Sequence, residues 1–304
     1  MRKLLMALCI IALFSVPAVY SAGQSQGTAH PGTQGTGTQN IGTQGFAFDA
    51  ISTMNQAVTA TEQEFTPQDE YYLGRAVAAN ILASYRPYTG NPELSRYLNL
   101  ICQTLAINSS KPVLFNGYSV MILDSAEFNA FATPGGHIFL TKKLIETATS
   151  EDMLAAIIAH ELAHIMLHHG TGIIDEMRLM DDMSATANRA SGIAGSQSAA
   201  ANQAAYFRSS VTSSIDTMMK NGYSQTQEFE ADKEAVSLLA ASGYNPMALV
   251  EILAILQRVQ PSQSGGFNTT HPSPAMRISS VQPAVNRYRI QDTSSYRVSR
   301  FKNK

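Results

Sequence analysis

Residues 149–170 read TSEDMLAAIIAHELAHIMLHHG, and they decide how this chain of 304 residues is interpreted. Apolar side chains recur there every three or four positions, which is typical of a buried helix. Thr149 and Asp152 match a capping-box signature at the start of this helix, and Gly170 suits its end. We therefore expect one continuous helix over this stretch.

Two histidines in this helix, His160 and His164, are four residues apart and enclose Glu161. Residues at that spacing share one helical face and lie about 6 Å apart along the axis. Both imidazoles can then bind one tetrahedral Zn²⁺, while the glutamate reaches a metal-bound water as a catalytic base. This H-E-x-x-H pattern predicts a zinc-dependent peptidase.

A catalytic zinc ion needs a third protein ligand, and the next histidine in the helix does not supply it. His168 lies eight residues beyond His160, about 12 Å away along a straight helix, which is too far to share a metal ion. We expect His168 to interact with the dipole at the C-terminal end of the helix instead.

Glu228 is the better candidate for the third ligand. In a helix over residues 224–241, Glu228 and Asp232 share an otherwise apolar inward face, whereas Glu230 falls on an outward polar face. Buried carboxylates need partners. Zn²⁺ would satisfy Glu228, and the far nitrogen of a ligating histidine would satisfy Asp232. The alternative is a pair of structural salt bridges.

Hydrophobic periodicity elsewhere predicts further helices and two short strands. The helices fall at residues 69–85, 91–105 and 246–259, and the strands at residues 120–123 and 136–141. Together with the two helices above, this pattern predicts an α+β fold that is mainly α-helical.

The N-terminus has the features of an export signal. Arg2 and Lys3 precede an apolar run that is too short to span a bilayer, and small residues follow up to Ala22. We therefore expect residues 1–22 to be a signal peptide, with an uncleaved membrane anchor as the alternative. We expect the protein to be located in the periplasm, and the alternatives are a secreted or a membrane-associated protein. Loss of the signal would leave Cys102 as a lone cysteine, which we expect in the core.

Composition divides the remainder of the chain. Residues 23–46 are rich in Gly, Thr and Gln and are expected to form a linker to a folded domain at 47–283. Within that domain, 171–222 is an insertion that could be a lid, an oligomer contact or a membrane-facing element. The basic tail, 284–304, alternates like an exposed edge strand from Asn286 onwards, with peripheral contact to anionic lipid as the alternative. Charged residues make up only 14% of the chain and the formal net charge is -2, which argues against nucleic-acid binding.

Four ordered motifs together resemble a known family. They are Asn129-Ala-Phe-Ala-Thr-Pro-Gly-Gly136, His160-Glu-Leu-Ala-His164, Glu228-x-Glu-Ala-Asp232, and His271-Pro272 followed by Arg277. In this combination the chain resembles the gluzincin metallopeptidases, a family that includes the CAAX prenyl proteases and bacterial periplasmic quality-control proteases. The resemblance is closest to the soluble periplasmic branch. It implies a zincin-like domain with a small sheet whose edge strand flanks the active-site helix.

The resemblance also implies roles for the residues of the helical motifs. His160, His164 and Glu228 would bind one Zn²⁺ per chain, and Glu161 would be the catalytic base. Asp232 would support a ligating histidine from behind.

The remaining motifs would act on the substrate. Asn129, Ala130 and Phe131 would lie on an edge strand that pairs with an extended peptide. His271 would donate a hydrogen bond to the transition state, or be a fourth ligand that closes the site; a loop histidine without a role is the alternative. Arg277 would anchor the loop that carries His271 or polarise the substrate carbonyl.

The expected function is therefore that of a zinc metalloendopeptidase in protein quality control. Its substrates would be polypeptides, in particular misfolded or unassembled envelope proteins. The alternative is a zinc-containing chaperone or assembly factor with a self-restrained site, because a neutral His271 in the fourth position would displace the catalytic water. Neither the cleavage specificity nor the oligomeric state is indicated by the sequence.

Overall fold

Three short strands form a mixed sheet in this computed structural model, which describes residues 65–172, 222–259, 271–288 and 294–302. The strands are β1 (Ser119–Leu123), β2 (Ala130–Thr133) and β3 (His137–Thr141), in the order β1-β3-β2. β1 runs parallel to β3 and β2 antiparallel to it. β2 is therefore an edge strand, as predicted.

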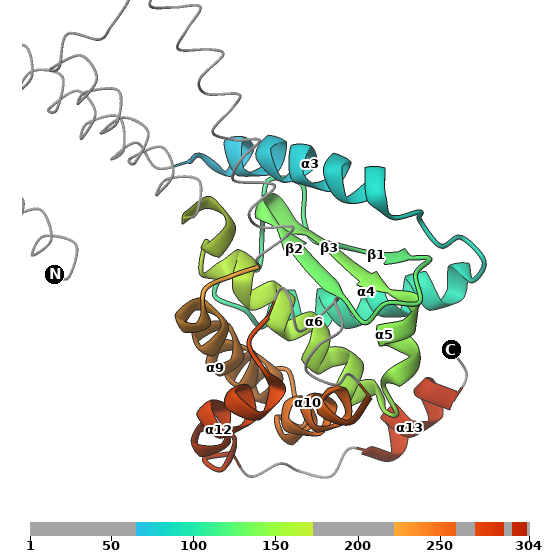
Figure 1. Ribbon diagram of the computed structural model, residues 1–304, viewed down its shortest axis with the longest axis vertical. Helices are drawn as coiled ribbons and strands as arrows, with labels where there is room; N and C mark the ends of the chain where they lie inside the picture. The colour runs from blue at the N-terminus through green and yellow to red at the C-terminus, as the bar shows by residue number, and fades with distance from the viewer. Residues whose placement is uncertain (1–64, 173–221, 260–270, 289–293, 303–304) are drawn as a thin grey trace, which may run out of the picture. The chain divides into compact units, whose positions relative to one another are not determined.

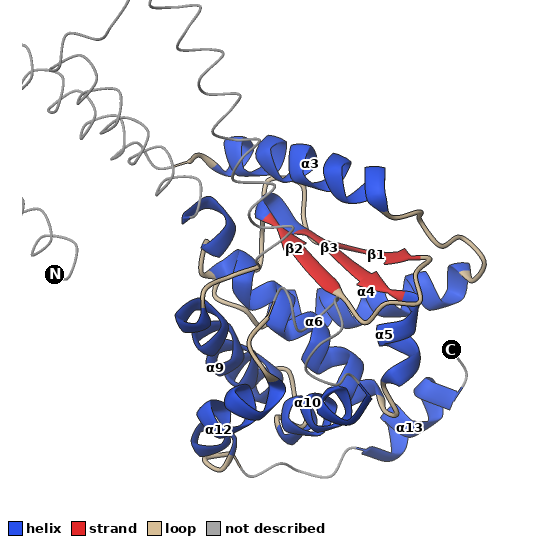
Figure 2. Cartoon of the chain, viewed as in Figure 1, coloured by secondary structure: helices blue, strands red, loops and turns tan. Residues whose placement is uncertain are grey.

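Helices surround this sheet, and all described residues belong to one contact unit, Gln44–Lys304 (Figures 1 and 2). The described helices are α3 (Pro67–Ser84), α4 (Pro92–Ile107), the 3₁₀ turn η1 (Pro134–Gly136), α5 (Lys142–Thr147), α6 (Glu151–Met166), α9 (Gln225–Ala241), α10 (Met247–Val259), α12 (Pro274–Val285) and α13 (Ser294–Lys302). The predicted α+β, mainly α-helical fold is confirmed.

α6 is the central helix of the core. All of its residues except Asp152 are buried, because α4 and the sheet cover one side of it and α9 and α10 the other. Its N-cap is Ser150, whose side chain accepts a hydrogen bond from the backbone N–H of Met153 at 3.2 Å. The predicted cap, Thr149, was wrong by one residue.

The predicted end of this helix at Gly170 was also wrong. α6 ends at Met166, and His168 adopts a left-handed backbone conformation with φ of 56°. Residues 169–172 are helical again, so the chain changes direction at a histidine and not at a glycine. His168 does not act on a helix dipole alone: its Nδ1 lies 2.5 Å from Oε1 of Glu70 in α3, and its Nε2 contacts Lys111.

α3 lies against the turn η1 because two glycines let the backbones touch. A Cβ atom on Gly74 would lie 1.7 Å from the carbonyl oxygen of Pro134, and one on Gly135 would lie 2.4 Å from Cα of Tyr71. Gly135 also has φ of 73°, which side chains rarely tolerate. This contact holds the turn between β2 and β3 in place.

The C-terminal tail is helical where the structure describes it, so the strand predicted from Asn286 onwards was wrong. In α13, Arg297 and Arg300 are three residues apart and share one helical face. Arg297 Nε lies 2.9 Å from Oδ2 of Asp152, and Arg300 Nη2 lies 2.5 Å from Oε1 of Glu151. These ion pairs with the start of α6 stabilise a helix in the tail, although the tail sequence alternates like a strand.

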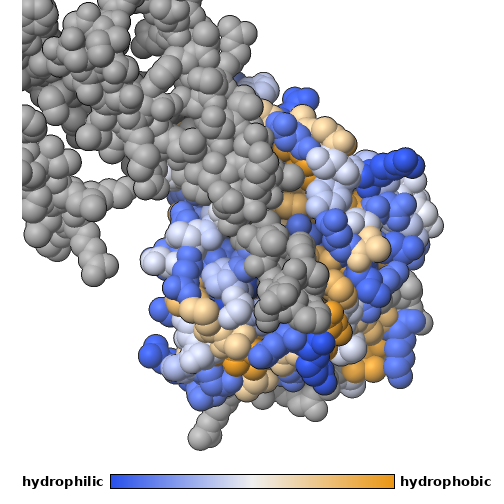
Figure 3. Space-filling model, in the orientation of Figure 1, coloured by the Kyte–Doolittle hydropathy of each residue, from blue (hydrophilic) through white to orange (hydrophobic). Residues whose placement is uncertain are grey.

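Several predicted segments lie outside the described residues: the signal peptide at 1–22, the linker at 23–46 and most of the insertion at 171–222. None of the helices in the described ranges is long and apolar enough to cross a membrane. On the face shown in Figure 3, hydrophilic residues predominate among the described residues, with hydrophobic side chains visible between them.

Candidate metal centre

α6 and α9 bring the three predicted ligands together. Glu228 lies in the first turn of α9, a helix that begins at Ser224 with a capping box completed by Gln227. The Nε2 atoms of His160 and His164 are 3.2 Å apart. Glu228 Oε2 lies 3.5 Å from His160 Nε2, and Glu228 Oε1 lies 3.4 Å from His164 Nε2. All three side chains are buried.

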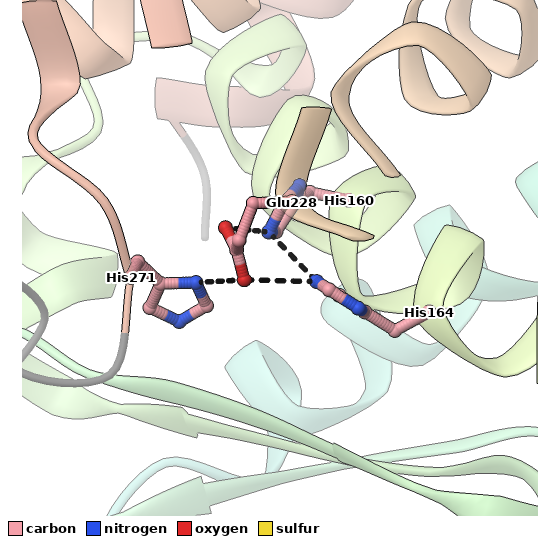
Figure 4. A group of neighbouring side chains, drawn as sticks. All are labelled: His160, His164, Glu228 and His271. Atoms are coloured by element: carbon pink, nitrogen blue, oxygen red, sulfur yellow. Dashed lines mark hydrogen bonds and ion pairs between the residues drawn. The ribbon is translucent and has the colours of Figure 1, made fainter. Parts of the chain in front are cut away.

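His271 completes this group. It precedes α12, and its Nδ1 lies 2.7 Å from Oε1 of Glu228. Ligand atoms of His160, His164, Glu228 and His271 all lie within 4.8 Å of one another. Figure 4 shows the four side chains directed toward a common point.

The donors in this cluster fit a zinc ion. Nitrogen and carboxylate ligands at tetrahedral spacing are typical of catalytic zinc sites. Glu228 Oε2 is buried, yet it accepts no hydrogen bond from any described residue, as expected of an atom that binds a cation. His168, by contrast, lies outside the cluster, as its position in the sequence predicts.

Electrostatics keep two of the candidate ligands in the protonation states that metal binding requires. Burial lowers the pKa of His164 to about 3. Burial alone would raise the pKa of Glu228, but the neighbouring His271, His160 and His164 hold it well below its usual range. Burial and Arg277 oppose protonation of His160, yet the neighbouring carboxylates of Asp232 and Glu228 raise its pKa to about 9. A proton on His160 therefore competes with a metal ion.

Glu161 points its carboxylate into a buried, mostly apolar environment. Its side chain is 1% exposed, and its Oε1 has no hydrogen-bond partner among the described residues. Burial raises its pKa above the ordinary value, which suits a group that must both take and return a proton. The adjoining pocket is lined by Leu144, Ile157, His160, Glu161, Leu249, Ile252, Leu253, Leu256 and Arg277.

Asp232 and Arg277 form a pair behind His160. Arg277 donates from Nε and Nη2 to the two Asp232 carboxylate oxygens, at 2.9 and 2.6 Å. Asp232 Oδ1 also lies 3.1 Å from His160 Nδ1, on the side of the ring away from Glu228. Arg277 therefore holds the Asp232 carboxylate. Its two predicted roles, anchoring the loop that carries His271 and polarising a substrate carbonyl, stay predictions.

The predicted substrate strand lies beside this centre. The backbone N–H of Thr141 donates to the carbonyl of Asn129 at 3.0 Å. In the alternating antiparallel pattern, Ala130 and Ala132 therefore direct their backbone polar groups to the side of β2 that no described strand pairs with. Asn129 Oδ1 accepts from the N–H of Ala130, and the Tyr223 hydroxyl lies 3.4 Å from the carbonyl oxygen of Ala132. Pairing of Asn129, Ala130 and Phe131 with a peptide stays a prediction.

Two neighbours of His164 were missed by the sequence reasoning. The ring of Tyr223 stacks on it with centroids 4.0 Å apart and an angle of 15° between the planes. On another side, Nδ1 of His169 lies 2.9 Å from Nδ1 of His164. The position of Tyr223 directly before the cap of α9, five residues before Glu228, was the available signal for the first. No sequence signal predicts the left-handed His168 that positions the second.

Comparison with known proteins identifies the family. Residues 92–285 match peptidase family M48. The chain belongs to peptidase family M48. Its relatives include the beta-barrel assembly-enhancing proteases of Yersinia pestis, 25% identical over 81% of this chain and 48% of the relative, and of Escherichia coli K12, 24% identical over 79% and 49%. Metalloprotease LoiP of Escherichia coli K12 is 25% identical over 64% of this chain and 72% of its own length.

This M48 chain thus spans about half the length of the beta-barrel assembly-enhancing proteases that it matches. Membership confirms the predicted resemblance to a metallopeptidase family. The arrangement of His160, His164, Glu228 and His271 in one buried group agrees with the metal dependence of that family.

Proposed function

We propose that this chain is a zinc-dependent endopeptidase that cleaves envelope proteins in quality control. One observation carries the proposal: His160, His164 and Glu228, from two helices, converge at metal-ligand spacing beside the buried carboxylate of Glu161. The spacing within α6 brings the two histidines together and the fold adds Glu228 from α9, which gives the donor set that zinc chemistry needs.

The residues of the site would divide the reaction among them. His160, His164 and Glu228 would hold the zinc ion, which when bound supplies a Lewis acid that activates water and polarises the scissile carbonyl. Glu161 would accept the proton from the attacking water and deliver it to the leaving amine. Asp232 would hold the ring of His160 through its Nδ1, with Arg277 holding Asp232 in turn.

The proposed substrates are misfolded or unassembled envelope polypeptides. The relatives named beta-barrel assembly-enhancing proteases favour this class. The free edge of β2 would bind an extended backbone, which gives affinity with modest side-chain selectivity. Arg2 and Lys3, followed by a short apolar run, favour export, and the periplasm is the proposed location.

A second candidate is a zinc-containing chaperone whose peptidase activity is held off. The observation that favours it is the 2.7 Å contact between His271 Nδ1 and Glu228, which brings His271 within reach of the same metal ion. As a fourth ligand, His271 would occupy the position that water needs.

The test of the proposed enzyme uses Glu161→Gln, which keeps the size of the side chain and removes the base. We expect purified wild-type and variant proteins to contain equal zinc, while cleavage of labelled casein, an unfolded protein, falls by about 10²–10⁴-fold in the variant. Glu234→Gln, the same change on the outer side of α9, is the matched control and should leave cleavage unchanged. Wild-type cleavage by Glu161→Gln would overturn the proposal.

His271→Ala and a cellular assay separate the two candidates. If the enzyme is restrained by His271, His271→Ala raises casein cleavage; if His271 donates to the transition state, cleavage falls. Full rescue of outer-membrane assembly defects by Glu161→Gln would favour the chaperone, because only binding survives in that variant.

A further inference from the structure

We infer that His169 is a positioning residue, which fixes the ring orientation and tautomer of His164 through a hydrogen bond between their Nδ1 atoms. The inference rests on the proposed function, in which His164 binds the metal through Nε2. It adds to that site a residue from outside the H-E-x-x-H motif and the other three motifs.

The backbone at the end of α6 makes this contact possible. In a continuous helix His169 would lie about 140° around the axis from His164, on a different face. Instead α6 ends at Met166, and the left-handed conformation of His168 turns the chain back. His169 Nδ1 then lies 2.9 Å from His164 Nδ1, with ring centroids 5.0 Å apart and an angle of 68° between the planes.

The partners of each ring nitrogen determine where the hydrogens are. His164 Nε2 faces His160 and Glu228, so it is the metal-binding nitrogen, and its Nδ1 must carry the hydrogen. That hydrogen is donated to Nδ1 of His169, which must therefore carry its own hydrogen on Nε2. His169 Nε2 lies 3.5 Å from Oε2 of Glu230, which is the acceptor on that side.

The two ligating histidines are thus supported in parallel ways. His160 Nδ1 lies 3.1 Å from the Asp232 carboxylate, and His164 Nδ1 lies 2.9 Å from the His169 imidazole. The side chain of His169 is 5% exposed and that of Glu230 is 56% exposed. The contact between His164 and His169 is therefore protected from water, whereas the contact between His169 and Glu230 is not. We expect most of the effect to come from His169.

Zinc affinity separates the hydrogen bond from simple packing. The measurement is a competition for Zn²⁺ between the metal-free full chain and a chromophoric chelator. His169→Phe keeps a ring and loses the acceptor, and it should weaken zinc binding by about 10–100-fold. His169→Asn keeps an acceptor bonded to Cγ, at the position of Nδ1, and should bind zinc close to wild type. His137→Phe, the same substitution at the start of β3, is the matched control, since His137 contacts Ser119 and Tyr71 away from the four clustered side chains.

Each outcome decides the matter. With circular dichroism showing folded variants, wild-type affinity in His169→Phe overturns the inference and leaves the proposed function standing. Equal losses in His169→Phe and His169→Asn also overturn it, because packing alone would explain them. If the wild type itself binds no Zn²⁺, the proposed function fails and this inference fails with it.

Nitrogen-15 NMR of the zinc-loaded wild type gives an independent readout. We expect the hydrogen of His164 on Nδ1 and that of His169 on Nε2. A hydrogen on Nδ1 of His169 would overturn the inference whatever the affinities show, because that nitrogen could then not accept from His164.

Discussion

At the scale of single residues, the site places three carboxylates where burial disfavours their charged forms. Glu161, Glu228 and Asp232 are almost fully buried, and two of them are matched by basic partners. Glu161 is different, because its Oε1 has no hydrogen-bond partner among the described residues. A residue kept in such a place costs stability and supports a chemical role over a structural one.

This cost predicts a stability effect with a defined pH dependence. Burial raises the pKa of Glu161, so folding favours the protonated form; the contribution to stability is present below the ordinary pKa and is lost as pH rises through the raised value. At pH 7.5, Glu161→Gln should therefore raise the Tm of the metal-free protein by about 2–4 °C, and the difference should shrink toward pH 4. Calorimetry at both pH values checks this. A lower Tm at pH 7.5 would contradict it.

The sequence was sufficient for the residues whose positions follow from helical spacing. His160, His164, Glu228 and Asp232 each lie on a helix that forms as expected, so one periodicity argument predicts their shared location. His169 and Tyr223 could not be predicted in this way. One depends on a local left-handed residue, His168, and the other on a loop that crosses to β2.

At the scale of elements, the contact between α3 and η1 supports the strand beside the metal centre. Gly74→Ala would place a methyl group against the Pro134 carbonyl, at 1.7 Å before any relaxation. We expect the free energy of unfolding, measured in urea, to fall by about 1–3 kcal/mol. Gly172→Ala is the control, because that glycine is helical and its added Cβ meets no atom within 4 Å. A greater loss in Gly172→Ala than in Gly74→Ala would refute this account.

Errors in predicting elements came from long-range partners. The tail of the chain alternates like a strand, yet α13 forms there because Arg297 and Arg300 meet Asp152 and Glu151, nearly 150 positions earlier in the sequence. The hydrophobic periodicity of a short segment carries no information about partners so far away in the sequence. The end of α6 was mispredicted for a similar reason, since His168 is held by Glu70 of α3.

At the scale of the whole domain, the candidate centre joins segments far apart in the sequence. His160 and His164 come from α6, Glu228 from α9, and His271 from the segment before α12. A metal ion bound there would link these segments in the folded state only.

Zinc should therefore stabilise the protein by mass action. At a free concentration 1,000 times Kd, binding contributes about 4 kcal/mol, which corresponds to a rise in Tm on the order of 10 °C. A chelator should reverse the rise, and Glu228→Gln should show a much smaller one. A Tm that is the same with Zn²⁺ and with chelator would contradict the proposed site.

The central claim is that His160, His164 and Glu228 together bind zinc, and anomalous scattering tests it most directly. Crystals of the zinc-loaded Glu161→Gln protein, with data on both sides of the zinc absorption edge, would locate the ion without any assumption about activity. We predict one anomalous peak per chain, about 2.0–2.2 Å from Nε2 of each histidine and from a Glu228 carboxylate oxygen. A zinc-loaded crystal with no peak between these three side chains, or with its peak elsewhere, would contradict the claim.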